Sequence, residues 1–534
     1  MMAKNTIKPF MMVFNTQGMD EKNGIFFSKP SRAEYIENMH TISLGVFSAH
    51  QQGYKLLSQN LFSNQRIDGL VYYQALNNQQ FIIAAGGGQV AQLDLSGNFI
   101  ATISTALLSN NPVDFEVFQS NLFACQKGSM PLKWAGSGNM QPLSGFPITV
   151  GALTYDKPSM LERHVNRLVY ADFNGTISYP SHIAISDDLA PEIFTIGLND
   201  SDAAVIQVSP GDGQHITGMK SLHLPSTNKT VLLIFKETSV YVLNGDTPTT
   251  FSIDLVNATV GALNNRCIVQ VGNDILFMDR HRISSLSTVN ESGTLRFKPI
   301  ESDRIQKSLR ELNLYAADQC FAVHLPGRQE VWFGIPTGSS QVVNKILVYR
   351  YSLSSDDPEA WSIRTGLQVT CPLLTPDDVL LMGDYSGNIL KFFENNTYNT
   401  QPIPWRYRYP FYHFDNQLVN KRVVECFAWF LNPVPMDITF KTEWRGGGSG
   451  TKRSLTKTVT PKNGATYGVS TPPAAIFGQS YYNDIPLTKV RIPVWGNGEQ
   501  LRFELSGQTS SAGGPIFLGL TGLVEFMDAS RSYQ

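Results

Sequence analysis

The sequence predicts an all-β protein: a β-propeller of six or seven blades followed by a C-terminal β-sandwich-like domain. Helix signals are scarce along the 534 residues. Short apolar runs separated by glycine, asparagine and serine turns recur over residues 61–404, as they do in propeller blades. Over residues 405–534 the alternating runs become longer, which is typical of sandwich strands.

The composition suits a scaffold built from strands. Hydrophobic residues make up 42% of the chain and charged residues only 16%, whereas charged residues form roughly 25% of an average soluble domain. The formal net charge of -2 creates no overall field that would attract nucleic acid or an anionic membrane. A low charge also suits surfaces that become buried against neighbours in an assembly.

Residues 1–60 are predicted to form an N-terminal arm. Residues 1–24 lack a continuous apolar segment and a cleavage site, so we expect no secretory signal. No apolar run along the chain approaches the ~18 residues of a membrane span. Ser31 and Glu34 form a capping-box pattern, which predicts a short helix over residues 31–40.

Repeated strand–turn units fill residues 61–404. Each unit reads as an apolar strand, a turn, a second apolar strand and a further turn. One such sheet has two apolar faces and cannot bury both alone, but radial stacking buries them and protects the strand edges. The WD40 pairs and the sialidase box are absent. The units lie at 67–99, 114–138, 162–187, 215–246, 265–287, 319–353 and 373–395.

Two segments depart from the strand rhythm. Ile305, Leu309 and Leu312 recur at helical spacing, which predicts a short helix over residues 302–312. Residues 396–416 are rich in aromatics and proline and are interpreted as a linker that packs. We therefore place the last domain boundary near 405–418.

The motif search predicts no catalytic, metal or cofactor site. There is no HExxH, no GxSxG and no GxGxxG opening a helix, and "GGGSGTKRS" at 446–454 departs from the phosphate-binding loop. Asp200, Asp202 and Asp212 supply only half of a calcium loop and are interpreted as turn residues. We expect the five widely spaced cysteines to be small buried hydrophobes. The tryptophans have two interpretations, sheet cores or a sugar-binding groove: Trp134, Trp332, Trp361, Trp405, Trp444 and Trp495.

One loop is basic. Arg445, Lys452, Arg453 and Lys457, together with Lys462, flank or follow the glycine-rich stretch. The simpler interpretation is a solvated hairpin tip. The alternative is a contact with DNA phosphate or with a neighbouring subunit. Interleaved stacking aromatics are missing, so sequence-specific readout of DNA is not expected.

The order of these segments resembles the tail nozzle proteins of short-tailed bacteriophages, also called tail tubular protein B-like or tail stabilisation proteins. In the stretch "NRLVYADFNGTISYPSHIAISD", an Asn-Arg-Leu strand precedes a Ser-Asp strand, as in that family. The resemblance covers about nine-tenths of the chain, and its weight lies in the ordered series. The matching stretches are 36–60, 66–94, 114–136, 163–187, 216–246, 271–287, 301–312, 489–508 and 516–534.

The resemblance implies a structural virion protein of the viral tail. It implies a homohexameric ring that extends the tail tube below the portal and adaptor, carries tail fibres or spikes, and holds and then conducts DNA during ejection. Assembly would take place in the host cytoplasm. Low charge fits such a conduit, because a strongly basic wall would bind phosphates and slow the DNA.

Two rival functions stay open. A glycan-depolymerising propeller needs two or three carboxylates that converge on a pocket, and no set of acidic residues flanked by Trp or Tyr recurs across the blades. A propeller that binds host receptors would instead bind host cells as an isolated chain. The nozzle interpretation is the preferred one and predicts no enzymatic activity.

Overall fold

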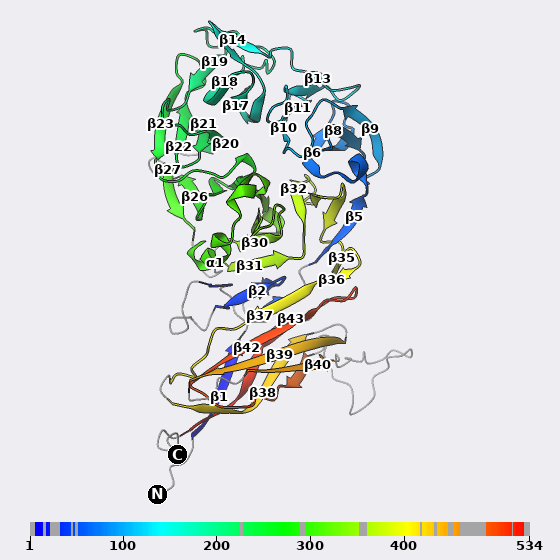
Figure 1. Ribbon diagram of the computed structural model, residues 1–534, viewed down its shortest axis with the longest axis vertical. Coiled ribbons are helices and arrows are strands. Elements are labelled where there is room, and N and C mark those ends of the chain that lie inside the picture. The colour runs from blue at the N-terminus through cyan, green and yellow to red at the C-terminus, as the bar shows by residue number, and fades with distance from the viewer. Residues whose placement is uncertain are drawn as a thin grey trace. The chain divides into compact units, whose positions relative to one another are not determined.

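A computed structural model of the chain describes most of its residues (Figure 1). Among its described helices, none combines the length and the apolar character needed to cross a membrane. The chain divides into two compact units, and we describe each by itself. Unit 1 comprises Met1–Lys55, Leu347–Gly366 and Phe392–Gln534, and Unit 2 comprises Leu56–Ile346 and Leu367–Lys391. The described residues are 6–13, 18–21, 32–43, 46–48, 52–224, 228–288, 295–300, 302–351, 360–416, 419–431, 435–446, 452–459, 487–514 and 516–527.

Unit 2 is a β-propeller, as the sequence predicts. Its described strands form seven blades, and Figure 1 shows them around a common centre. The first strand of each blade contacts the first strand of the next blade. β32 (Val369–Leu374) of the seventh blade contacts β6 (Ile67–Gln74) of the first, so the ring is closed. The count therefore resolves the six-or-seven alternative in favour of seven.

The first five blades are four-stranded antiparallel sheets. They consist of β6, β7 (Gln80–Gly86), β8 (Gln89–Leu93) and β9 (Phe99–Ser104); β10 (Asp114–Phe118), β11 (Asn121–Cys125), β12 (Leu132–Trp134) and β13 (Gln141–Pro142); β16 (Pro158–His164), β17 (Arg167–Asn174), β18 (Ser178–Ile185) and β19 (Ala204–Gln207); β20 (Ile216–Leu224), β21 (Lys229–Lys236), β22 (Val240–Asn244) and β23 (Ser252–Asn257); and β24 (Ile268–Val271), β25 (Asp274–Met278), β26 (Ile283–Thr288) and β27 (Leu295–Pro299).

The last two blades complete the ring. The sixth contains β28 (Phe321–Leu325), β29 (Glu330–Ile335) and β30 (Lys345–Arg350). The seventh contains β32, β33 (Leu380–Asp384) and β34 (Ile389–Phe392), and β5 (Tyr54–Ser58) lies beside β34 in the same sheet. A strand from before the first blade thus pairs with the last blade.

Short elements connect the blades. The helix predicted over 302–312 is confirmed, as a 3-10 turn that runs into a short α-helix. The remaining connections hold one hairpin and further 3-10 turns. These elements are η3 (Ser302–Ile305) and α1 (Gln306–Arg310); β14 (Ile148–Val150) and β15 (Leu153–Tyr155); and η1 (Leu61–Asn64), η2 (Asn265–Cys267) and η4 (Leu314–Gln319). Another 3-10 turn, η5 (Pro326–Arg328), lies inside the sixth blade between β28 and β29.

The hydrophobic core of the propeller lies between neighbouring blades. In β21, Val231, Leu233 and Phe235 pack into a cluster shared with the fifth blade. The alternate residues Leu232 and Ile234 pack into a cluster shared with the third blade. Because successive side chains on a strand point to opposite faces, a blade between two others needs a continuous apolar run. The run "VLLIF" meets that need.

Unit 1 contains two larger sheets. One holds β3 (His40–Ser43), β4 (Val46–Ser48), β43 (Ile516–Phe526), β38 (Lys421–Leu431) and β41 (Leu487–Arg491), with β1 (Thr6–Val13) also paired to β43. The other holds, in Unit 1, β31 (Ala360–Thr365), β2 (Tyr35–Glu37), β37 (Pro404–Arg408), β42 (Gln500–Gln508), β39 (Met436–Arg445) and β40 (Lys452–Val459). β35 (Thr397–Tyr398) and β36 (Gln401–Pro402) form a short hairpin.

Aromatic side chains from the two sheets of Unit 1 meet. The ring of Phe517 on β43 lies 5.1 Å from that of Trp405 on β37 and 4.7 Å from that of Phe430 on β38, between ring centroids. The Phe430 ring in turn lies 6.2 Å from that of Phe440 on β39. The C-terminal sandwich itself stays a prediction.

Two local predictions are wrong. Within residues 31–40 the structure has strand β2 instead of a helix, because Tyr35–Glu37 pairs with β37 and buries Ile36 completely. Residues 396–416 are not a linker, since β37 lies between β2 and β42 in a large sheet. In both places partners distant in the sequence outweigh local propensity.

The compact units also divide the chain differently from the predicted segments 1–60, 61–404 and 405–534. Residues 351–366 and 393–404 belong to Unit 1 and not to Unit 2. The reason is strand pairing: β2 of the predicted arm pairs with both β31 and β37.

Candidate functional site

The predicted basic residues lie on or beside one hairpin of Unit 1. Arg445 ends β39, while Lys452, Arg453 and Lys457 lie on β40. The glycine-rich tip itself and Lys462 fall outside the described residues. The Lys452 ammonium lies 3.3 Å from the carboxylate of Glu443 on the facing strand.

The structure brings only two of these four residues together. Lys452 and Arg453 line a groove of about 370 Å³ on Unit 1, which we call the cationic groove. Arg445 instead places its guanidinium 5.8 Å from the ring of Phe411. Lys457 donates from Nζ to the carbonyl of Arg491 at 2.8 Å and lines a different groove.

Four further cations line the cationic groove, and sequence analysis missed all four. They come from β37, β39 and β42, which are adjacent in the sheet. Alternation could have found the two on β37: in "WRYRY" the arginines fall at every second position, with buried residues between, so they share a face. The four residues are Arg406, Arg408, Lys441 and Arg502.

Carboxylates are interleaved with these cations. Glu504 accepts from Arg408 at 2.6 Å and from Lys441 at 3.2 Å, and Glu443 pairs with Arg502 as well as with Lys452. Burial would raise the pKa of Glu504, but the hydrogen bonds and charges of Arg408 and Lys441 hold that pKa below its usual value. The groove lining still has more cations than carboxylates.

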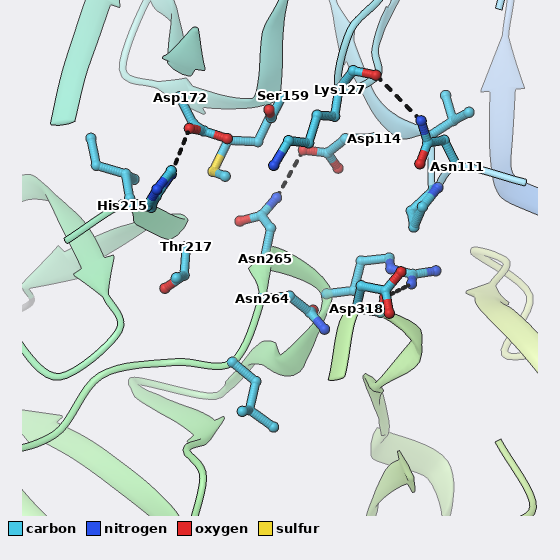
Figure 2. Close-up of a pocket in the computed structure, with 16 residues that line it drawn as sticks. Asn111, Asp114, Lys127, Ser159, Asp172, His215, Thr217, Asn264, Asn265 and Asp318 are labelled. Atoms are coloured by element: carbon cyan, nitrogen blue, oxygen red, sulfur yellow. Dashed lines mark hydrogen bonds and ion pairs between the residues drawn. The ribbon is translucent and has the colours of Figure 1, made fainter. Parts of the chain in front are cut away.

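A second polar region lies in the propeller. It is a pocket of about 470 Å³, the axial pocket, lined by inner-strand residues of several blades and by η2 (Figure 2). Figure 2 shows Asp114, Asp172, His215, Lys127 and Asn265 around it. Asp114 begins β10, Asp172 lies on β17, and His215 immediately precedes β20.

Carboxylates beside the axial pocket connect blades to one another. Asp114 of the second blade accepts from the Leu161 amide of the third blade at 3.1 Å, and from Asn265 Nδ2 of η2 at 2.8 Å. Glu162 of the third blade accepts from Lys220 Nζ at 3.0 Å and from the Ser221 amide at 3.1 Å, both in the fourth blade. These bonds link the inner strands across the blade boundaries.

Burial raises the pKa of several acidic side chains near the propeller axis. Desolvation raises the pKa of Asp114 to about 6 and that of Glu116 to about 7, and the charge of Glu162 adds to the second shift. Desolvation likewise raises the pKa of Asp68 to about 6, against the charge of Arg66. Such shifts occur at functional sites and in structural networks alike.

The structure also shows where the cysteines, tryptophans and candidate calcium-loop residues lie. All five cysteines are buried and unpaired. The part of the chain that the structure describes holds no group of three or more His, Cys, Asp or Glu residues placed to bind a metal. Five of the six tryptophans considered above are buried in cores, whereas Trp495 is half exposed. Asp212 of the candidate calcium loop accepts from the buried Lys236.

Comparison with known proteins finds partial likenesses to solved structures and no family. No family model matches the chain, and neither does any of the curated proteins. A streptogramin B lyase structure has a TM-score of 0.40 at 11% identity, covering 64% of this chain and 96% of that chain. YCF48 from Cyanidioschyzon merolae has a TM-score of 0.39 at 12% identity, covering 64% and 98%. The WD40 β-propeller domain of Doa1 has a TM-score of 0.37 at 9% identity, covering 64% and 97%.

Proposed function

We propose that this chain is a structural, non-catalytic virion protein, the tail nozzle of a short-tailed bacteriophage. Copies of the chain would form a ring, which the family resemblance implies to be a homohexamer. The ring would lie below the adaptor in the viral tail and carry fibres or spikes. It would hold the genomic DNA and then conduct it during ejection.

The observation that carries this proposal is the way the two units are connected. The chain passes between Unit 1 and Unit 2 four times, at 55/56, 346/347, 366/367 and 391/392. A binding domain on a tether needs only one connection. Four connections distribute a mechanical load over several covalent links, which suits a protein that holds DNA under pressure.

The DNA path in this proposal runs through the ring of copies and not along the propeller axis. Asp114 of the second blade accepts from Asn265 of η2, which precedes the fifth blade, and the bonds of Asp114 and Glu162 also join adjacent inner strands. Opening the axis would break buried, charge-assisted hydrogen bonds. The propeller thus serves as a rigid wall element.

The cationic groove is the candidate surface for transient contact with DNA. Lys452 and Arg453 face it, together with the four cations missed by sequence analysis. Glu443 and Glu504 already neutralise several of these cations. Fewer free cations mean fewer released counterions and weaker binding, as a conduit requires.

The test is assembly with the neighbouring tail proteins. The full chain would be produced alone and together with the adaptor and portal proteins encoded beside it, and imaged by negative-stain electron microscopy. Rings that contain the chain, and its detection by mass spectrometry in purified virions of the same phage, are expected. A chain that stays monomeric with those partners and is missing from the virions would contradict the proposal.

A further inference from the structure

The axial pocket contains a buried carboxylate that no described part of the protein fully satisfies. We propose that this pocket binds a neutral, polyhydroxylated ligand, a sugar, through Asp172. The inference concerns Unit 2 alone and does not depend on the proposed tail role.

The backbone at Asp172 is unusual. The register between β17 and β18 shifts between Ala171 and Phe173, which is a β-bulge. Asp172 has a φ of 54° in the left-handed region, which a non-glycine residue rarely adopts. Ala171 and Phe173 are completely buried in the cores on either side. Bulges redirect side chains and often lie next to binding sites, and this one directs Asp172 into the pocket (Figure 2).

The oxygens of Asp172 are unequally satisfied. Oδ2 accepts from Asn174 Nδ2 at 3.1 Å. Oδ1 is buried and accepts no hydrogen bond from the described residues, and Nδ1 of His215 lies 3.5 Å from it. The residue as a whole is 5% exposed. A buried acceptor without a donor costs free energy, so a ligand hydroxyl that donates to Oδ1 would be favoured.

The charges of the pocket indicate a neutral ligand. Three aspartates face two permanent cations and His215 around the cavity, so the pocket creates little net field for a polyanion or a polycation. Amides, hydroxyls and apolar side chains make up the rest of the lining: Asn111, Ser159, Thr217, Asn264 and Asn265, and Pro112, Val113, Met160, Ile216 and Leu263. A hydroxyl group both donates and accepts, so a polyol can serve the carboxylates and the cationic donors at once. The cavity of about 470 Å³ lies in the range of small-molecule pockets. The charged residues are Asp114, Asp172, Asp318, Lys127 and Arg266.

The experiment measures sugar binding to the full-length chain. Saturation-transfer NMR would screen D-glucose, D-galactose, D-mannose, L-rhamnose and N-acetyl-D-glucosamine, and titration calorimetry would follow any hit up to about 20 mM, since millimolar affinity is typical of few contacts. At least one sugar should bind saturably. Asp172→Asn keeps the shape and tolerates the left-handed backbone, and it should weaken binding tenfold or more.

The matched control is Asp200→Asn, an exposed position in the same blade outside the pocket lining. It should bind the sugar like the unaltered chain, and both variants should melt like it. The inference is overturned if none of the five sugars binds, or if Asp172→Asn binds as well as Asp200→Asn. It is also overturned if putrescine or inorganic phosphate binds in the pocket more tightly than any sugar.

Discussion

The two units use carboxylates in opposite ways. In Unit 2, desolvation and the charge of Glu162 outweigh Lys220 and Arg163 at the half-buried Glu116, and its pKa rises to about 7. In Unit 1, Glu504 is also buried, yet Arg408 and Lys441 donate to it, and its pKa falls below the usual value. The surroundings of Glu116 therefore disfavour its charged form, whereas those of Glu504 favour it. Desolvation acts on both acids, but the hydrogen bonds and charges of Arg408 and Lys441 outweigh it only at Glu504.

The largest effect should come from the interblade core. Phe235→Ala removes a ring that is completely buried between the fourth and fifth blades. Large-to-small changes of this kind cost about 3–5 kcal/mol. Urea denaturation followed by tryptophan fluorescence should show this loss, whereas a loss below about 1 kcal/mol would mean that blade stacking does not hold the ring.

The next effect should come from the bonds between blades at the axis. Asp114→Ala removes the acceptor of the Leu161 amide and of Asn265 Nδ2. Two donors left without a partner should cost about 2 kcal/mol of unfolding free energy. Asp377→Ala, at an exposed turn of Unit 2, provides the control and should change stability little. Equal effects of both substitutions would show that Asp114 does not connect the blades.

The third prediction tests the contrast between the units by pH. A raised folded pKa means that the native state binds more protons, so Glu116 reduces stability as pH rises from about 4.5 to about 7. Glu116→Gln should therefore stabilise the protein at pH 8 by about 1 kcal/mol, after allowance for solvent screening, and the gain should vanish near pH 4.

Glu504→Gln should behave in the opposite way. Its lowered folded pKa stabilises the protein above the ordinary value of 4.5 and loses that contribution as pH falls. The substitution should cost about 1 kcal/mol at pH 7 and progressively less below pH 4. Melting temperatures of both variants from about pH 2 to about pH 8 provide the measurement, because the titration of Glu504 lies below its ordinary value of 4.5. Parallel pH profiles for the two variants would contradict the comparison.

The smallest effect should come from the rim of the cationic groove. Lys452 is exposed and pairs with Glu443 at the surface, where ion pairs contribute between zero and about 1 kcal/mol. Lys452→Gln should change the melting temperature by less than a degree or two while weakening any binding to DNA fragments at low salt. A large loss of stability would show that the ion pairs of the groove mainly stabilise the fold and do not mainly serve DNA contact.

Local pattern in the sequence was sufficient for much of the fold. The apolar run of β21, the turns between strands and the helical spacing of Ile305 and Leu309 all act over a few residues, so the all-β class, the blades and the helix near 302–312 could be predicted. Lys452 and Glu443 are also neighbours because they face each other on the two strands of one hairpin.

Only the tertiary structure decided the rest, because it depends on partners far apart in the chain. β5 beside β34 settles the seventh blade, and β2 beside β37 replaces a local helix signal by a strand. The cationic groove assembles side chains from strands nearly a hundred residues apart, such as Arg408 and Glu504. The bulge that directs Asp172 into the axial pocket arises because two neighbouring blades bury the residues on either side of it. Sequence periodicity specifies on which face of its strand a side chain lies. Packing against a partner distant in the chain determines what that face contacts.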